Sequence, residues 1–138
     1  MTNAADLLAP DTAMGAVTLR VGDLDRMVGY YRDAVTLDVI SQQGGIALLG
    51  RAGRPRRVLE HEPELWSADP RSPGLLHTAI VIATEAALAA AVYSVASRDP
   101  HGFTGSSDHL VSKAFYFTDP EGNGVELYWD RDRTEWSW

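Results

Sequence analysis

The alternation of apolar and polar residues predicts a strand, a helix and three further strands in the first half of the chain. Residues 16–21 alternate as in a half-buried strand. Apolar residues then recur at helical spacing to about Val35, after a candidate N-cap at Asp23. Three short strands are expected next, separated by turn-forming residues, at 37–41, 46–49 and 57–61.

The same order of elements returns in the second half. Residues 76–83 alternate, Thr84 is a candidate N-cap for an alanine-rich helix to about Ser97, and strands are expected at 111–118 and 125–129. Gly105-Ser106-Ser107 is typical of a turn. This repetition predicts an α+β fold of two βαβββ modules in which the two sheets close over one cleft.

The expected boundaries follow from this repeat. We predict one domain with a first module at about 15–62, a linker rich in proline and charge at 63–74, a second module at about 75–130, and a polar tail at 131–138. Residues 1–14 are expected to form an arm without a folded element. The two tryptophans of the tail are expected to pack on the domain itself or on a partner subunit.

Composition narrows the classes of partner. The chain has 138 residues, 45% of them apolar, and a net charge of −7, which argues against nucleic acid or an anionic membrane as the main partner. No apolar run approaches the roughly 20 residues needed to span a bilayer, and the first residues lack a basic signal-peptide region. The absence of cysteine excludes disulfides and thiolate metal sites. We therefore predict a cytoplasmic protein that acts on a small molecule.

Two strand residues carry the candidate chemistry. Glu126 stands between Val125 and Leu127 in a predicted strand, and burying a carboxylate there is costly unless it is paired or binds a metal. His77 stands in the first strand of the second module, where a neutral imidazole could bind the same divalent ion. The alternatives are that Glu126 points into solvent and that His77 is a hydrogen-bonded structural residue.

A metal site usually needs a third protein ligand. In the pseudo-symmetric halves Ala16 corresponds to His77, and Glu60 corresponds roughly to Glu126. Glu60 is therefore the first candidate for the third ligand, and His61 is the next. Strand alternation places these neighbours on opposite faces, so only one of them can enter a cleft. The alternative for both is a charged strand end.

The segment before the last two strands offers further polar groups. Asp108 and His109 could form a carboxylate–imidazole pair or bind substrate, provided that they lie in a loop; the alternative is turn chemistry. Tyr116, in the strand before Glu126, could donate a hydrogen bond to a bound oxyanion or simply pack.

These segments together resemble the vicinal-oxygen-chelate superfamily of glyoxalases, bleomycin-resistance proteins and extradiol dioxygenases. The similarity lies in residues 17–26, 30–33, 74–79, 107–112 and 119–128, and the most specific stretch is Asp-Pro-Glu-Gly-Asn-Gly-Val-Glu-Leu-Tyr at 119–128. The last two segments are most similar to catechol-2,3-dioxygenase-like members. The resemblance implies the two-module fold more directly than it implies one reaction.

The resemblance also implies a metal cleft. His77 and Glu126 retain the identity of ligands, Tyr116 falls where extradiol dioxygenases keep a substrate-side tyrosine, and Glu60 lies near a carboxylate of glyoxalase I-like members. Three positions depart from the family pattern. Ala16 stands where the family has the histidine of the first strand, and Gly105 stands where dioxygenases have an acid–base histidine before the Asp-His segment. Val35-Thr36 stands in place of the usual Leu-Gly after the first helix.

Three functions follow from this resemblance. The first is a metal-dependent enzyme, dioxygenase-like or glyoxalase-like, that holds Fe(II) or Mn(II) through His77, Glu126 and Glu60, with Tyr116 and His109 as catalytic residues. The second is a binding protein for an aromatic compound or drug, which has a degraded metal site and no bound metal. The third is a structural or regulatory domain whose metal site is vestigial. A homodimer is expected in each case, because members with one pair of modules commonly form twofold dimers.

Overall fold

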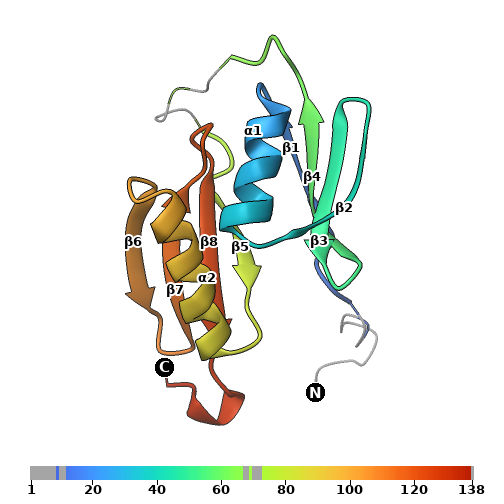
Figure 1. Ribbon diagram of the computed structural model, residues 1–138. Helices are drawn as coiled ribbons and strands as arrows, with labels where there is room; N and C mark the ends of the chain where they lie inside the picture. The colour runs from blue at the N-terminus through green and yellow to red at the C-terminus, as the bar shows by residue number, and fades with distance from the viewer. Residues whose placement is uncertain (1–8, 10–11, 67–68, 70–72, 138) are drawn as a thin grey trace.

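Two four-stranded sheets, each covered by helix on one face, make up the chain (Figure 1). The computed structural model describes residues 9, 12–66, 69 and 73–137. The first module contains β1 (Val17–Val21), α1 (Leu24–Gly29), the π-helical turn η2 (Tyr30–Ala34), β2 (Asp38–Gln43), β3 (Ile46–Arg51) and β4 (Arg54–His61). The second contains β5 (His77–Val81), α2 (Glu85–Arg98), β6 (Phe103–Asp108), β7 (Ser112–Thr118) and β8 (Gly124–Asp130), and the 3-10 turn η3 (Arg133–Glu135) follows.

The two sheets have the same topology. Their strand orders are β1-β4-β3-β2 and β5-β8-β7-β6, and in each the first strand pairs in parallel with the last strand of its module. The remaining pairs are antiparallel. The α+β fold of two βαβββ modules predicted from the repeated pattern is therefore confirmed.

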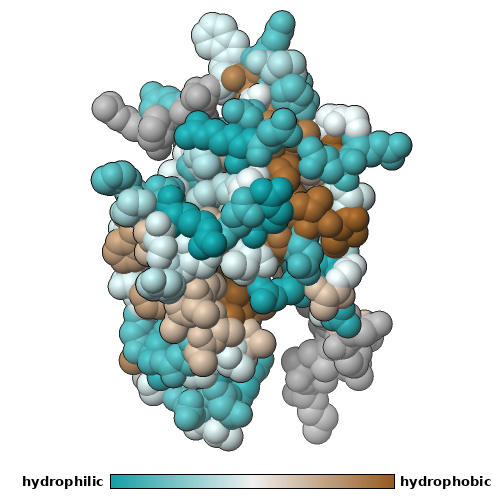
Figure 2. All heavy atoms as spheres, viewed as in Figure 1, coloured by the Kyte–Doolittle hydropathy of each residue, from teal (hydrophilic) through white to brown (hydrophobic). Residues whose placement is uncertain are grey.

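Strand alternation assigns one face of each sheet to the core. In β8 the exposed fractions of Val125 and Leu127 are 1% and 0%, and both side chains point toward the helices, whereas Glu126 points to the opposite face. Apolar residues of α1 and α2 complete this core, among them Met27, Leu88 and Val95. We call the opposite side of each sheet its helix-free face. On the helix side, Figure 2 shows mostly hydrophilic atoms, with hydrophobic atoms gathered between α1 and strands β2 and β3.

The structure corrects two elements of the prediction. Strand β6 occupies the segment in which Gly105-Ser106-Ser107 predicted a turn, and it is an edge strand paired with β7 alone. Its glycine and serines have low strand propensity, so the pairing with β7 decides the conformation. The first helix also changes from α-helix to π-helix at Tyr30, and Val35 is its C-cap.

The start of the tail is joined to its own domain, since the Arg131 backbone donates to the carbonyl oxygen of Val111 at 2.9 Å. The indole nitrogen of Trp136 donates within the tail to the carbonyl oxygen of Arg131 at 3.0 Å, and the guanidinium of Arg133 lies 4.5 Å from the centre of the Trp136 ring. The expected packing of the tail tryptophans on the domain or on a partner subunit stays a prediction, and Trp138 lies outside the described residues. The expected arm and linker also lie partly outside them.

A buried polar set joins the two modules. Arg57 of β4 is 1% exposed, and its guanidinium lies 4.5 Å from the centre of the Tyr31 ring. One of its nitrogens donates to the Thr78 hydroxyl in β5 at 3.1 Å. The Tyr31 hydroxyl in turn donates at 2.8 Å to Asp119, whose residue is 4% exposed. A buried cation of the first module and a buried anion of the second are thus connected through one aromatic ring.

The free energy of unfolding is expected to fall as the pH rises above 10.0, the ordinary pKa of a tyrosine. Burial is the largest cause that raises the pKa values of Tyr30 and Tyr31 in the folded chain. The stability that the two protonated tyrosines contribute is therefore complete below the tyrosine pKa of the unfolded chain. It is lost as the pH rises from there through the higher tyrosine pKa values of the folded chain. Urea unfolding at several alkaline pH values measures this slope.

Tyr30→Phe provides the matched variant for this measurement. The buried Tyr30 hydroxyl has no hydrogen-bond partner among the described residues, so the variant removes one titrating group without breaking a hydrogen bond. The alkaline slope should become shallower, and stability at neutral pH should be unchanged or slightly higher. A slope as steep as that of the parent chain would contradict the assignment.

Candidate functional site

Two residues on the helix-free face of the second sheet form the centre of the site. The imidazole Nε2 of His77 lies 2.9 Å from the carboxylate Oε2 of Glu126, and the two side chains are 35% and 12% exposed. His77 begins β5, and Glu126 lies in β8, opposite Ala79 of β5. Parallel pairing with alternating side chains puts both on one face, and the sequence predicted this juxtaposition.

Tyr116 and His109 extend this pair across the sheet. Tyr116 of β7 is the register partner of Glu126, and its ring meets the His77 ring edge-on with centres 5.7 Å apart. The Tyr116 hydroxyl lies 2.9 Å from Nε2 of His109. Partial burial is the first cause that raises the pKa of Tyr116, and the nearby Glu126 carboxylate is the second, so the phenol stays protonated at neutral pH.

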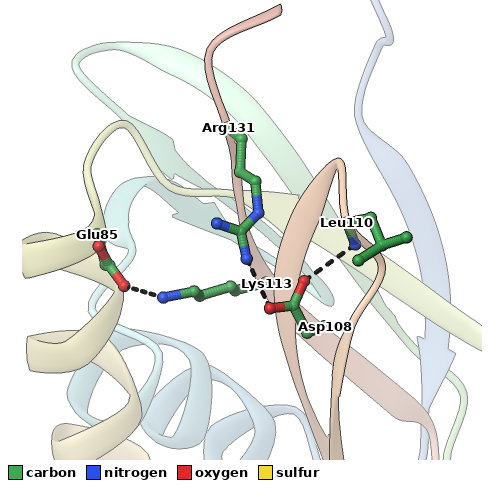
Figure 3. Close-up of polar contacts among 5 residues, drawn as sticks. All are labelled: Glu85, Asp108, Leu110, Lys113 and Arg131. Carbon is green, nitrogen blue, oxygen red and sulfur yellow. Dashed lines mark hydrogen bonds and ion pairs between the residues drawn. The ribbon is translucent and has the colours of Figure 1, made fainter. Parts of the chain in front are cut away.

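The turn that carries His109 is fixed by ionic contacts (Figure 3). Asp108 accepts a hydrogen bond from the Leu110 backbone at 2.9 Å, and the Arg131 guanidinium binds the same carboxylate at 2.6 Å. The backbone hydrogen bond and then Arg131 hold the pKa of Asp108 below its ordinary value. On the same side, Lys113 of β7 pairs with Glu85 at the start of α2. Asp108 therefore shapes the turn and does not pair with the neighbouring imidazole.

A cavity of about 450 Å³ adjoins His77 of the central pair, whereas Glu126 is not among its lining residues. It is lined by His77 and Tyr116 together with residues from the ends of β5, β6 and β7 and the start of β8, including Leu76, Thr104 and Gly124. This volume falls in the range of small-molecule sites. A second cavity of about 360 Å³ lies between the helices, where Arg26 and Arg98 line it, and it does not include the central pair.

The third predicted ligand is not near this centre. Within the described ranges of the chain, no group of three His, Asp or Glu side chains is placed to hold a metal ion, so Glu60 does not join His77 and Glu126. Strand register gives the reason. His77 pairs with Gly124, two residues before Glu126, and continuing the register from Val17 opposite Arg57 places Ala16 opposite residue 56.

The position equivalent to Glu126 is therefore Val58 and not Glu60, so the first module lacks both ligand types at the equivalent places. Glu60 lies opposite Arg20 on the first sheet. His61 lies on the other face, as alternation predicted, and its Nε2 is 3.2 Å from the carbonyl oxygen of Gly22.

The central pair fits two positions of a divalent metal site. Ligand atoms that occupy adjacent positions about 2.0–2.2 Å from one ion lie about 3 Å apart, close to the separation between His77 and Glu126. An imidazole and a carboxylate suit Fe(II), Mn(II) or Zn(II). The described part of the chain supplies two protein ligands, whereas catalytic sites commonly use three.

Sequence reasoning missed the residues that hold the site in place. Arg57 was assigned only to a strand, although it alternates with the apolar Leu59, and that pattern marks a position facing the core. The segment 119–128 is the most specific part of the family resemblance, but no pattern in one sequence indicates that Asp119 binds Tyr31 of the other module.

The two repeated modules define the class of fold, and comparison with known families agrees. The family model described as the Glyoxalase/Bleomycin resistance protein/Dioxygenase superfamily matches residues 13–127. The chain therefore belongs to this superfamily, as the resemblance of its motifs implied.

One curated relative gives a more detailed comparison. The chain is 34% identical over 129 residues to a protein named catechol-2,3-dioxygenase from Bacillus subtilis (strain 168). The match covers 91% of this chain and 44% of the relative, so the chain spans less than half the length of that protein.

Solved structures of the same superfamily share the fold. A glyoxylase/bleomycin resistance protein/dioxygenase domain from Frankia sp. EAN1pec has a TM-score of 0.73 at 19% identity, covering 87% of this chain and 98% of that one. A lactoylglutathione lyase from Agrobacterium tumefaciens has a TM-score of 0.66 at 20% identity, with coverages of 88% and 96%. A fosfomycin resistance protein from Listeria monocytogenes has a TM-score of 0.64 at 14% identity, with coverages of 90% and 98%.

Among the described residues, the helices are too short or too polar to cross a bilayer.

The Glu126→Gln variant is expected to lower the pKa of Tyr116, because it removes the carboxylate charge that opposes ionisation of the phenol. Ultraviolet difference titration measures this, with Tyr116→Phe variants of both proteins subtracted to isolate the one phenol. Asp130→Asn serves as the control, since Asp130 acts on Tyr128 and is not among the causes that shift Tyr116. An unchanged Tyr116 titration in Glu126→Gln would show that the two groups are not coupled.

Proposed function

We propose that this chain is a metal-dependent enzyme that chelates two neighbouring oxygens of a small aromatic substrate, with dioxygenase-like ring cleavage as the leading reaction. The observation that carries the proposal is the His77–Glu126 pair, 2.9 Å apart, of which His77 lines a cavity of about 450 Å³. The 34% identity to the Bacillus protein named catechol-2,3-dioxygenase supports the substrate class.

In this proposal His77 and Glu126 would hold a divalent ion, Fe(II) or Mn(II), next to the cavity that His77 lines. When bound, such an ion supplies Lewis-acid stabilisation of a catecholate or enolate, and iron supplies in addition a place for O₂. His77 and Glu126 now contact each other directly, and with an ion bound each would keep a charged or polar partner in place of that contact.

Tyr116 and His109 are the proposed catalytic residues. The raised pKa of Tyr116 keeps its hydroxyl protonated, so the hydroxyl can donate a hydrogen bond to a substrate oxyanion beside His77. His109, 2.9 Å from the same hydroxyl, can accept or return a proton through it. This gives the cavity a proton path that does not use either proposed ligand.

We further propose a homodimer whose second copy contributes the missing part of the site. Strand β5 is an edge strand that begins at His77, and apolar side chains in and beside it are open to solvent: Leu76 is 82% exposed and Val81 is 51% exposed. A second copy over this edge would cover those side chains and could bring a carboxylate such as Glu60 to the pair. A cytoplasmic location stays a prediction, supported by the absence of cysteine.

Metal content is the direct test of the proposed function. The protein, purified without a histidine tag, is expected to bind about one Fe(II) or Mn(II) per chain on reconstitution. His77→Ala and Glu126→Ala should each weaken binding by more than about 100-fold, since partners of ligands alone contribute 10–100-fold. His101→Ala, at an exposed turn histidine, is the matched control and should bind like the parent. Equal metal content in all four proteins would remove the metal site from consideration.

The dimer has its own test. Leu76→Glu is expected to shift the protein toward monomer in sedimentation velocity, because it places a charge in the proposed apolar interface. Tyr93→Glu, on α2 and 75% exposed, is the control and should leave the assembly state unchanged. If the parent chain sediments as a monomer at every concentration, the proposed second copy is wrong.

A binding protein without catalysis is the second candidate, and Ala16 and Val58 favour it because they leave the first module without ligands. Oxygen uptake with a panel of catechols separates the two. A dioxygenase consumes O₂ in a metal-dependent manner that Tyr116→Phe slows, whereas a binding protein retains the aromatic compound and consumes none.

A further inference from the structure

The segment 119–124, which comprises the turn between β7 and β8 and the first residue of β8, touches both the first module and the strand that carries His77. We call it the 119–124 turn. Its middle residue, Glu121, binds the start of the first helical segment. The Gly22 backbone donates to Oε2 of Glu121 at 3.0 Å, and the Asp23 backbone donates to Oε1 at 2.7 Å. One carboxylate of the second module is therefore held at both oxygens by two successive amides of the first.

The end of the same turn lies against His77. Gly124 is the register partner of His77, and a Cβ added at Gly124 would lie 2.3 Å from the carbonyl oxygen of Leu76 and 2.8 Å from the Cβ of His77. Backbone atoms cannot yield by that much, so only glycine lets β5 come this close to β8. The position of β5 at His77 is therefore set by the last residue of the turn.

Between these two ends the turn is stiffened from within. Oδ1 of Asp119 accepts from the Glu121 backbone at 3.0 Å, from the Asn123 backbone at 2.9 Å and from the Asn123 side chain at 3.1 Å. Its Oδ2 accepts from the Tyr31 hydroxyl at 2.8 Å. The backbone positions of Glu121 and Asn123, the neighbour of Gly124, are thus tied to the same carboxylate.

We propose that the 119–124 turn positions the His77–Glu126 pair according to how the first module is docked, and that Glu121 and Gly124 are positioning residues for the site. The role in metal binding rests on the proposed function of that pair, whereas the role in placing His77 does not. Residues 119–124 would then set the geometry of the site through their backbone contact with β5, without themselves ligating the metal.

The test uses the variants Glu121→Ala and Glu121→Gln, of which the second is the milder change. Glu64→Ala is the matched control, because Glu64 is an exposed glutamate in the region between the two modules. The first readout is the ¹⁵N-edited NMR spectrum of the imidazoles in metal-free protein, well below the unfolding temperature. The His77 resonances should shift in Glu121→Ala, shift less in Glu121→Gln and stay unchanged in Glu64→Ala. A residue that only stabilises the fold would not move them, because every variant is fully folded under these conditions.

The second readout is the affinity for Co(II), followed by its visible absorption. Glu121→Ala should weaken it by about 10-fold, the lower end for residues that orient ligands, and Glu64→Ala should not change it. If His77 shifts but even the parent binds no Co(II), the positioning role stands and the proposed metal function fails. If the parent binds Co(II) and neither readout responds to Glu121→Ala, the positioning role is overturned. If the Gly124→Ala variant folds, it should shift the His77 resonances and weaken Co(II) binding more than Glu121→Ala does. The Glu121 variants decide the test even if Gly124→Ala does not fold.

Discussion

The contact between the Arg57 guanidinium, the Tyr31 ring and the Asp119 carboxylate is the constraint on which the rest of the structure depends. Each charge is buried, and neither module could keep its own charge buried alone at an acceptable cost in free energy. The two halves therefore need each other in one orientation. Apolar packing of the helices supplies most of the stabilisation, but it is less directional than these polar contacts.

That orientation determines what the second sheet can do. With Asp119 fixed by Tyr31, strand β8 starts at a defined place, and Glu126 reaches His77 across the helix-free face. Tyr116 lies next to Glu126 by strand register, and its hydroxyl lies near His109. The polar residues of the candidate site and the apolar residues of the core thus lie on opposite faces of one sheet. Neither set occupies positions that the other needs.

Most of the fold could be predicted from periodicity, because alternation in β8 and helical spacing in α2 are local signals. Strand β6 escaped prediction, since its glycine and serines adopt a strand only through pairing with β7. In the site, His77 and Glu126 were placed correctly because parallel pairing and alternation suffice. The assignment of Glu60 depended on strand register, which one sequence does not encode locally, and a shift of two residues separates it from Val58.

The duplicated halves have diverged at the places of the candidate pair. The register equivalence pairs His77 with Ala16 and Glu126 with Val58, so an imidazole and a carboxylate in one half correspond to a methyl group and an isopropyl group in the other. Each chain consequently offers one imidazole–carboxylate pair and, at the equivalent places of the other half, two small apolar side chains. Because Ala16 and Val58 carry no polar group, changes in their size would alter the shape of the first sheet's surface and leave the polar groups of the second sheet in place.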